Sequence, residues 1–230
     1  MQHSVEIENG DCQKIIDLIQ GRSVPKAFYN IGVGQDELTM NEAVFLKQKF
    51  PDIEIYGVEA NPNFVKIRQE NYPGNLLSVG IWSEKCKKTL TVPVAGVGRS
   101  SLLPARKEWA ESRNFKESET IEVECMTLDD LDKLAGKPEK IWLWMDIEGA
   151  ELEALKGAEE LLKSRRLDCI SFEVSTVDFL PGEQLARRHG EPTMPELIDY
   201  LGSFGYHVQS ILSRASIFAN VLFLRKELLQ

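Results

Sequence analysis

Two glycines and two acids lie close together near the start of the chain and could form a ligand site. The stretch "AFYNIGVGQDELT", residues 27–39, is an apolar run that reaches Gly32 and Gly34 and continues into Asp36 and Glu37. A glycine turn after a parallel strand is a common place for a bound nucleotide. The dinucleotide fingerprint G-x-G-x-x-G needs its third glycine where this chain has Glu37.

The two acids restrict the ligands that this turn could bind. A like-charge pair about 4 Å apart costs on the order of 4 kcal/mol at an effective dielectric near 20, so a diphosphate would be repelled. NAD and ATP are therefore poor candidates. S-adenosyl-L-methionine has no phosphate and carries a sulfonium cation, so it needs the tight turn but no anion site. It is the cofactor that these residues predict.

Glu59 adds a second feature of such a site. It ends the strand-like run "IEIYGVEA", residues 53–60. An acid at the tip of the second strand can accept hydrogen bonds from both hydroxyls of a ribose. A single acid at a strand end could equally be a solvated carboxylate, and the glycine turn favours the ribose site. We expect Glu59 to be exposed and to contribute little to folding.

Further acids occur at the ends of two later strands. Asp146 follows the apolar run "IWLWM", Glu173 lies near the end of "LDCISFEV", and His189 lies in the loop "RRHGEP". Methyl transfer to a hydroxyl needs alignment and a group that takes up the proton of the alcohol. We rank Asp146 first for this role, Glu173 second and His189 third.

Other interpretations of these residues remain open. Glu148 and Glu151 lie where a helix begins, and acids there are favoured by the helix dipole. His189 could be a solvated residue of a charged loop. Asp146 and Glu173 could share a divalent cation such as Mg²⁺, which prefers hard oxygen ligands. We predict a site without a metal and transfer that does not depend on one.

The elements that would position these residues alternate along the chain. Strand-like runs occupy 27–32, 53–60, 76–82, 141–147 and 167–174, and helical patterns lie between them, including 38–50 and 149–166. This alternation predicts an α/β fold with a mostly parallel sheet and helices on both faces. The last two strands, 206–212 and 216–226, are joined by too few residues for a parallel crossover, so they are predicted to form an antiparallel hairpin.

The chain is predicted to be one domain, 1–230, with two additions to this pattern. A lead-in helix is expected within 1–26, with Asp11 as its N-cap. A polar region without a clear period, 95–119, is expected to be a lid or insertion. Capping residues are expected at Asn61, Thr127 and Thr193.

Composition excludes several classes of partner. The chain has 230 residues, 43% of them hydrophobic, and a net charge of -9. A phosphate backbone would meet mostly repulsion, so nucleic acid is not an expected partner. No apolar run has the length of a membrane span, and the N-terminus lacks a signal-like pattern, so we expect a cytoplasmic protein with no membrane partner. Cys12, Cys86, Cys125 and Cys169 are far apart and are expected to be reduced structural thiols.

The sequence resembles the FkbM-type S-adenosylmethionine-dependent methyltransferases. The resemblance rests on the stretch "WMDIEGAELEALKGA", residues 144–158, and on the order of shorter motifs. These are "VEANP" at 58–62, "SSL" at 100–102, "TLDDL" at 127–131, "DIEGAE" at 146–151 and "SFEV" at 171–174. It covers roughly residues 27–225, and it implies a Rossmann-like methyltransferase fold with a seven-stranded sheet.

The resemblance also implies roles for individual residues. Gly32 and Gly34 would border the methionine end of the cofactor, and Glu59, followed by Ala60, would hold the ribose. Gly80 and Ile81 would lie by the adenine. Apart from the resemblance, Trp82 could flank the adenine, and Asp146 lies at the strand end where we expect the methyl group, so both are also candidate cofactor residues.

Two residues depart from the usual motif of the family. Asn30 stands where Asp is usual and could hydrogen-bond a cofactor amine through its carbonyl without adding a charge. Asp36 stands where Gly is usual and could restore a nearby negative charge.

The acceptor class comes from the resemblance alone. It implies O-methylation of a small molecule, either a sugar or a secondary metabolite. N-methylation of a small molecule and a non-catalytic cofactor-binding domain are the alternatives, and a homo-oligomer is compatible with the sequence.

Overall fold

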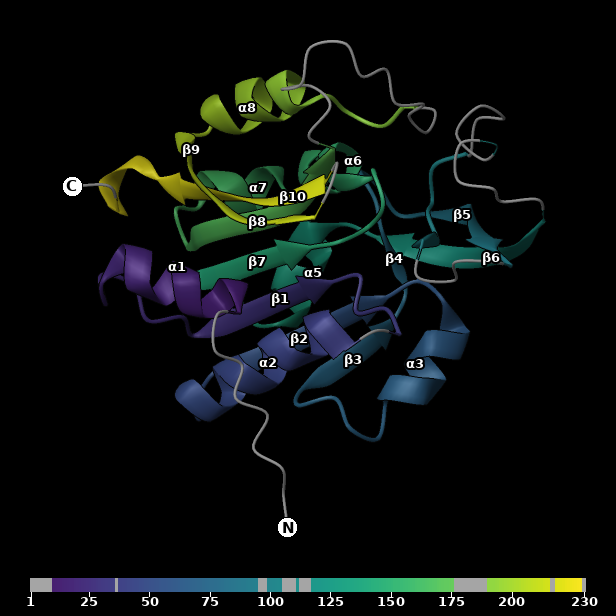
Figure 1. Cartoon of the computed structure of the whole chain (residues 1–230), viewed down its shortest axis with the longest axis horizontal. Helices are drawn as coiled ribbons and strands as arrows, with labels where there is room; N and C mark the ends of the chain where they lie inside the picture. The colour runs from purple at the N-terminus through teal and green to yellow at the C-terminus, as the bar shows by residue number, and fades with distance from the viewer. Residues whose placement is uncertain are drawn as a thin grey trace.

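A seven-stranded sheet forms the centre of the protein (Figure 1). The computed structural model describes residues 10–35, 37–94, 99–104, 111, 117–175, 190–215 and 218–228, with the backbone alone at 37–39, 175 and 214–215. The strand order is β3-β2-β1-β7-β8-β10-β9. The strands are β1 (Ala27–Ile31), β2 (Glu54–Glu59), β3 (Asn75–Ser78), β7 (Ile141–Met145), β8 (Leu167–Ser175), β9 (Tyr206–Ala215) and β10 (Phe218–Arg225).

The direction of the strands confirms the predicted fold class. The first five of these strands are parallel, whereas β10 pairs antiparallel with both β8 and β9. The sheet is therefore mostly parallel with a C-terminal antiparallel hairpin, as in a Rossmann-like methyltransferase fold. Strand order reverses between β1 and β7, and ligands in such sheets bind at the carboxyl ends of the strands near that reversal.

Helices cover both faces of the central sheet. They are α1 (Asp11–Ile19), α2 (Glu37–Lys49), α3 (Pro62–Arg68), α5 (Leu128–Leu134), α6 (Glu151–Lys156), α7 (Glu159–Lys163) and α8 (Met194–Gly202), followed by the 3-10 helix η3 (Lys226–Leu228). Apolar residues of α1 and α2 pack in one buried cluster, and those of α5 to α8 pack in another. Among the described residues, no helix is both long and apolar enough to cross a membrane.

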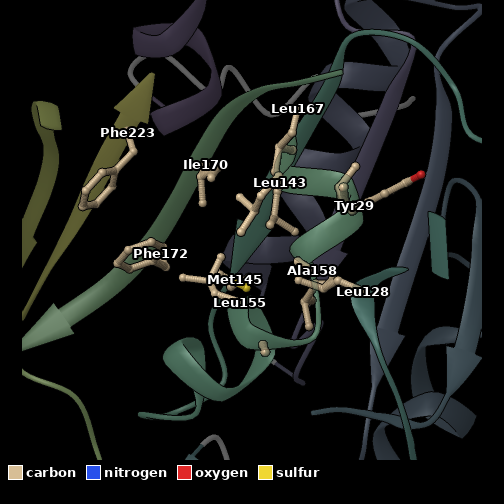
Figure 2. Close-up of a cluster of buried hydrophobic side chains, with 14 of the residues drawn as sticks. Tyr29, Leu128, Leu143, Met145, Leu155, Ala158, Leu167, Ile170, Phe172 and Phe223 are labelled. Atoms are coloured by element: carbon tan, nitrogen blue, oxygen red, sulfur yellow. The ribbon is translucent and has the colours of Figure 1, made fainter. Parts of the chain in front are cut away.

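The core beneath α5 to α8 is built from alternate residues of the central strands. Figure 2 shows Leu143 and Met145 of β7 beside Ile170 and Phe172 of β8, on the side that faces Leu155 of α6. Phe172 stacks on Phe223 of β10, with ring centroids 5.2 Å apart. All five residues of β7 are buried, as expected for a strand covered on both faces.

Local capping signals were predicted well. Thr127 and Asp130 form a capping box at the start of α5. Thr193 forms another with Glu196 at the start of α8. Asn61 caps α3, where its side chain accepts a hydrogen bond from the backbone N–H of Asn63 at 3.0 Å. The structure therefore confirms all three predicted caps. Such caps can be predicted from sequence because each depends on residues three or fewer positions apart.

The predicted N-cap at Asp11 is wrong, because Gly10 occupies that position. The backbone N–H groups of Asp11 and Cys12 instead donate to the carboxylate of Glu42 in α2, at 2.7 and 3.0 Å. The carboxylate of Asp11 accepts hydrogen bonds from Ser213 and Asn220. The first helix is thus capped by a partner from a neighbouring helix, which local sequence does not reveal.

The predicted strand at 76–82 is divided between two sheets. Ser78 pairs with Glu59 in the central sheet, whereas Gly80 pairs with Cys125 in a second sheet. This small sheet has the order β4-β6-β5 and lies to one side of the central sheet (Figure 1). Its strands are β4 (Gly80–Ile81), β5 (Cys86–Pro93) and β6 (Ser118–Met126).

The predicted helix at 149–166 is also divided, into α6 and α7. The break lies at Gly157, where a Cβ atom would come within 2.4 Å of the backbone oxygen of Trp82. The close approach of the segment after β4 therefore requires a glycine at this point. Of the predicted lid at 95–119, only residues 99–104, 111 and 117–119 lie within the part of the chain that the structure describes.

Candidate active site

A cavity of about 650 Å³, including its open mouth, lies at the carboxyl ends of β1, β2 and β7. The small sheet forms one of its walls. The cavity is lined by residues 31–34, 58–60, 64, 79–81, 90, 100–102, 146–148 and 150.

The glycine turn after β1 needs its two glycines for different reasons. Gly32 has a φ of +86°, and a Cβ atom there would lie 1.9 Å from the backbone oxygen of Asp146. Gly34 has a φ of +62°, with nothing within 4 Å of an added Cβ. Gly32 therefore allows the close approach of β1 and the loop after β7, whereas Gly34 is required by its left-handed backbone.

Glu59 joins the end of β2 to this turn. One carboxylate oxygen accepts the backbone N–H of Gly34 at 2.8 Å, and the other accepts that of Asn61 at 2.6 Å. The residue is only 7% exposed, so the expectation of an exposed acid is wrong. Burial raises the pKa of Glu59, while its backbone hydrogen bonds oppose this shift. A carboxylate has about four lone-pair sites, so further donors such as ribose hydroxyls can still be accepted.

Arg68 of α3 holds the same turn from outside the cavity. Its guanidinium group donates to the backbone oxygens of Gly34 and Gln35, and the residue is 8% exposed. The role of Arg68 is not apparent from the sequence. No spacing signal marks it, because Arg68 lies 33 positions after the carbonyl of Gln35.

The loop after β7 is held by three separate contacts. The backbone N–H of Asp146 donates to Ile31 at 2.9 Å. Glu151 accepts the backbone N–H groups of Ile147 and Gly149, both at 3.3 Å. The hydroxyl of Ser101 donates to the backbone oxygen of Glu148 at 2.9 Å. These contacts hold the loop although Glu148 has a left-handed φ of 55°, which is costly for a residue other than glycine.

Glu151 lies in the first turn of α6, as expected, and also contacts the loop that precedes this helix. It is 3% exposed, and its carboxyl group turns back onto the loop that precedes α6. Burial raises the pKa of Glu151 to about 8, and the nearby Glu191 adds to the shift. Glu151 therefore positions the loop that carries Asp146.

Part of the predicted lid is a fixed wall of the cavity. Ser101 exchanges two backbone hydrogen bonds with Thr91 of β5, at 3.0 and 3.1 Å. Its hydroxyl also accepts the backbone N–H of Leu103 at 3.1 Å. Ser101 is 1% exposed, so the segment is anchored to both β5 and the loop after β7. Ser100 and Leu102 line the cavity on either side of it.

Most of the predicted cofactor residues meet in this cavity. Those that line it are Gly32, Gly34, Glu59, Ala60, Gly80, Ile81 and Asp146. Asn30 and Trp82 do not. Asn30 is fully buried within β1, where its amide donates to the hydroxyl of Tyr72 at 3.1 Å. The ring of Trp82 packs under Lys88, whose Nζ lies 3.5 Å from the ring centroid.

The three candidates for the proton acceptor have different positions. Asp146 lines the cavity. Glu173 does not line the cavity. Asp146 and Glu173 nevertheless lie near each other in register, because each follows one member of the pair formed by Met145 of β7 and Phe172 of β8. His189 lies outside the described residues, as does Asp36. No group of three or more metal-binding side chains occurs in the described part of the chain.

The charge of the cavity is one-sided. Three of its lining residues, Glu59, Asp146 and Glu148, are acidic, and no Lys, Arg or His occurs among the described residues that line it. Such a lining attracts a cation and repels a phosphate. A glycine turn, a buried acid at the tip of β2 and a described lining without cationic side chains therefore fit S-adenosyl-L-methionine, which carries a sulfonium cation and no phosphate.

The fold and this cavity define an α/β protein with a candidate cofactor site at the reversal of strand order. The family model described as the Methyltransferase FkbM domain matches residues 27–208. The chain belongs to this family, and its cofactor is S-adenosyl-L-methionine.

Solved structures of other methyltransferases are similar at the level of the fold. A TehB-like SAM-dependent methyltransferase from Corynebacterium glutamicum is 11% identical, with a TM-score of 0.43 and coverage of 97% of this chain and 91% of that chain. A SAM-dependent methyltransferase from Aquifex aeolicus is 12% identical, with a TM-score of 0.44 and coverage of 96% and 93%. Human N-acetylserotonin methyltransferase in complex with SAM is 11% identical, with a TM-score of 0.47 and coverage of 95% and 52%.

A search of curated proteins finds no significant match.

Proposed function

We propose that this methyltransferase transfers a methyl group to a hydroxyl of a small molecule, either a sugar or a secondary metabolite. One observation carries the proposal: Asp146 shares an acidic cavity with Gly32, Gly34 and Glu59. A cofactor held by the glycine turn and Glu59 would thus lie in the same cavity as a carboxylate that can accept a proton.

Different residues of the cavity bind different parts of the cofactor. Glu59 accepts the ribose hydroxyls while it holds the turn through Gly34. Gly80 and Ile81 present backbone and a small apolar surface to the adenine. The cofactor supplies an electrophilic methyl group on a sulfonium centre.

Asp146 is the proposed proton acceptor. Its backbone is fixed to Ile31, and the loop that follows it is fixed by Glu151 and Ser101. A carboxylate held in this way can align an acceptor hydroxyl and take up its proton, which is worth about 10² to 10⁴ in rate. Glu173 and His189 remain the second and third candidates, and of these Glu173 does not line the cavity.

The acceptor class rests on the family, and an amine acceptor is the competing outcome. Carboxylates such as Asp146 and Glu148 can orient an amine as well as a hydroxyl, because both groups donate hydrogen bonds. N-methylation of a small molecule would therefore use the same cavity.

A panel of acceptors tests the proposal. Purified protein is incubated with S-adenosylmethionine and with sugars, phenols, aliphatic alcohols and amines, and S-adenosylhomocysteine release is measured with and without EDTA. We expect turnover with a hydroxyl acceptor, an O-methyl product by NMR, and no effect of EDTA. Turnover with amines alone would replace O-methylation with N-methylation. Cofactor binding without turnover on the whole panel would favour a non-catalytic domain.

A further inference from the structure

Two cysteines that are far apart in the sequence are direct partners across the small sheet. Cys86 of β5 lies opposite Cys125 of β6 in the antiparallel ladder. The two thiols are in hydrogen-bonding contact. Directly opposite residues in such a ladder have Cα atoms about 4.5 to 5.5 Å apart, and disulfides span Cα separations of about 4.4 to 6.8 Å. The pair is therefore within reach of a disulfide without a large backbone movement.

The two thiols differ in access. Cys86 is partly exposed, whereas Cys125 is 5% exposed. Burial raises the pKa of the Cys125 thiol to about 12, so this thiol is protonated at neutral pH. A dissolved oxidant would therefore meet Cys86 first. The other two cysteines, Cys12 and Cys169, are both fully buried in the core beneath α1 and α2.

Cys86 and Cys125 are joined through the small sheet to the wall of the cavity. Gly80 is the parallel partner of Cys125 and lines the cavity. A Cβ atom at Gly80 would lie 2.8 Å from the sulfur of Cys125 and 2.9 Å from the side chain of Leu102, another lining residue. The sulfur of Cys125 thus fills the space directly behind the cavity wall.

We propose that Cys86 and Cys125 are a site of reversible disulfide formation, and that the disulfide weakens cofactor binding. An S–S bond of about 2.05 Å is shorter than any contact between two thiols. Its formation draws the sulfur of Cys125 toward Cys86 of β5 and away from Gly80 of β4, which lies on the other side of β6. The wall then loses a packing neighbour on its outer side.

The exchange needs a disulfide as oxidant, for which oxidised glutathione serves. The thiolate of Cys86 attacks one sulfur of glutathione disulfide, and one glutathione thiolate leaves. Cys125 then loses its proton to water and attacks the sulfur of Cys86, which releases the second glutathione. Two electrons pass from the two cysteines to glutathione disulfide, and excess thiol reverses both steps.

Peptide mapping under non-reducing conditions tests whether the disulfide forms. The full chain is equilibrated in glutathione buffers of increasing oxidised fraction, trapped and digested. We expect a linked peptide that contains Cys86 and Cys125 in the wild type and in the control Cys12→Ser, and no such peptide in Cys86→Ser. Absence of the link in excess oxidised glutathione, or a link between Cys12 and Cys169 in its place, would overturn the proposal.

Calorimetric titration with S-adenosylhomocysteine tests the effect on the cavity. We expect oxidation to weaken binding to the wild type by at least about threefold, or roughly 0.6 kcal/mol. Dithiothreitol should restore the affinity, and Cys86→Ser should show no dependence on the redox buffer. Equal affinity of the oxidised and reduced wild type would overturn the coupling between disulfide and cavity. The reduced wild type tests the cofactor assignment separately, because its failure to bind would reject that assignment whether or not the disulfide forms.

Discussion

Glu59 accepts a hydrogen bond from the backbone N–H of Gly34 at 2.8 Å, which joins the end of β2 to the glycine turn after β1. Its other oxygen accepts the N–H of Asn61 at 2.6 Å, at the start of α3. One buried carboxylate therefore organises two sides of the cavity before any ligand binds. A change at this residue should affect both folding and cofactor binding.

We expect Glu59→Ala to lower both stability and affinity. Loss of two hydrogen bonds to a carboxylate, at about 1.5 to 3 kcal/mol each, should cost about 3 to 6 kcal/mol of unfolding free energy. Loss of the ribose contacts should weaken S-adenosylmethionine binding by roughly ten- to several-hundred-fold. Denaturant unfolding and calorimetric titration measure the two effects. Glu54→Ala is the control, because Glu54 is an exposed acid at the other end of β2. A Glu59 variant with unchanged affinity would contradict the ribose assignment.

Alanine substitutions should separate the roles of the two glycines. Gly32→Ala should cost well over about 3 kcal/mol, because the new Cβ would collide with the backbone of Asp146 and the φ is left-handed. Gly34→Ala should cost only about 1 to 2 kcal/mol, since nothing lies near its Cβ.

The matched control for Gly34 is Gly21→Ala, at a similar positive φ and open position after α1. We expect Gly21→Ala and Gly34→Ala to lose similar stability in chemical denaturation, with ligand affinity reduced only in Gly34→Ala. Equal affinities of the two variants would mean that the Gly34 turn does not face the ligand.

Glu151 should make stability depend on pH. Burial raises its pKa from 4.5 to about 8. Between these two pH values the carboxyl group of Glu151 is protonated in the folded protein and ionised in the unfolded chain. This contribution to stability is fully present below about pH 4.5 and is lost as the pH rises through 8. Each unit of pKa shift corresponds to about 1.4 kcal/mol.

The pH dependence of stability is checked by thermal melts of the wild type and of Glu151→Gln. The melts are taken at about pH 6 and about pH 9, on either side of the raised pKa of about 8. The variant carries a neutral side chain of the same shape, so its melting temperature should fall less than that of the wild type between the two values. Parallel losses in both proteins would show that Glu151 is not the titrating group.

Asp146→Asn should preserve the fold and most cofactor binding but lower turnover by about 10² to 10⁴. The side chain keeps its shape, and the hydrogen bond to Ile31 comes from the backbone of Asp146 and is unaffected. Turnover is measured with an acceptor from the panel, alongside S-adenosylhomocysteine binding. Wild-type turnover in the variant would remove Asp146 from the mechanism and bring Glu173 forward.

The parts of the fold that could be predicted depend on short-range signals. The burial of β7 follows from an unbroken apolar run, and the caps at Thr127 and Thr193 depend on a partner three residues away. The antiparallel hairpin follows from the short connection between β9 and β10. The cavity could be anticipated because the carboxyl ends of parallel strands meet at one edge.

The parts that could not be predicted depend on pairing between distant segments. The predicted strand at 76–82 is divided at Val79 because the residues before it pair with β2 and those after it pair with β6. The sequence of the run 76–82 does not indicate either partner. The position of Asn30 in the first motif predicts that it contacts the cofactor. In the structure its amide group donates a hydrogen bond to the hydroxyl of Tyr72. The contact between Cys86 and Cys125 likewise appears only when β5 and β6 are paired.

Direct comparison of ligands tests the central claim that this acidic cavity binds a sulfonium nucleoside. Calorimetric titrations of the reduced wild type are run with S-adenosylmethionine, ATP and NAD under identical conditions. The three acidic lining residues and the glycine turn predict saturable binding of S-adenosylmethionine at one site per chain and no detectable binding of ATP or NAD. Binding of ATP or NAD with no binding of S-adenosylmethionine would contradict the account.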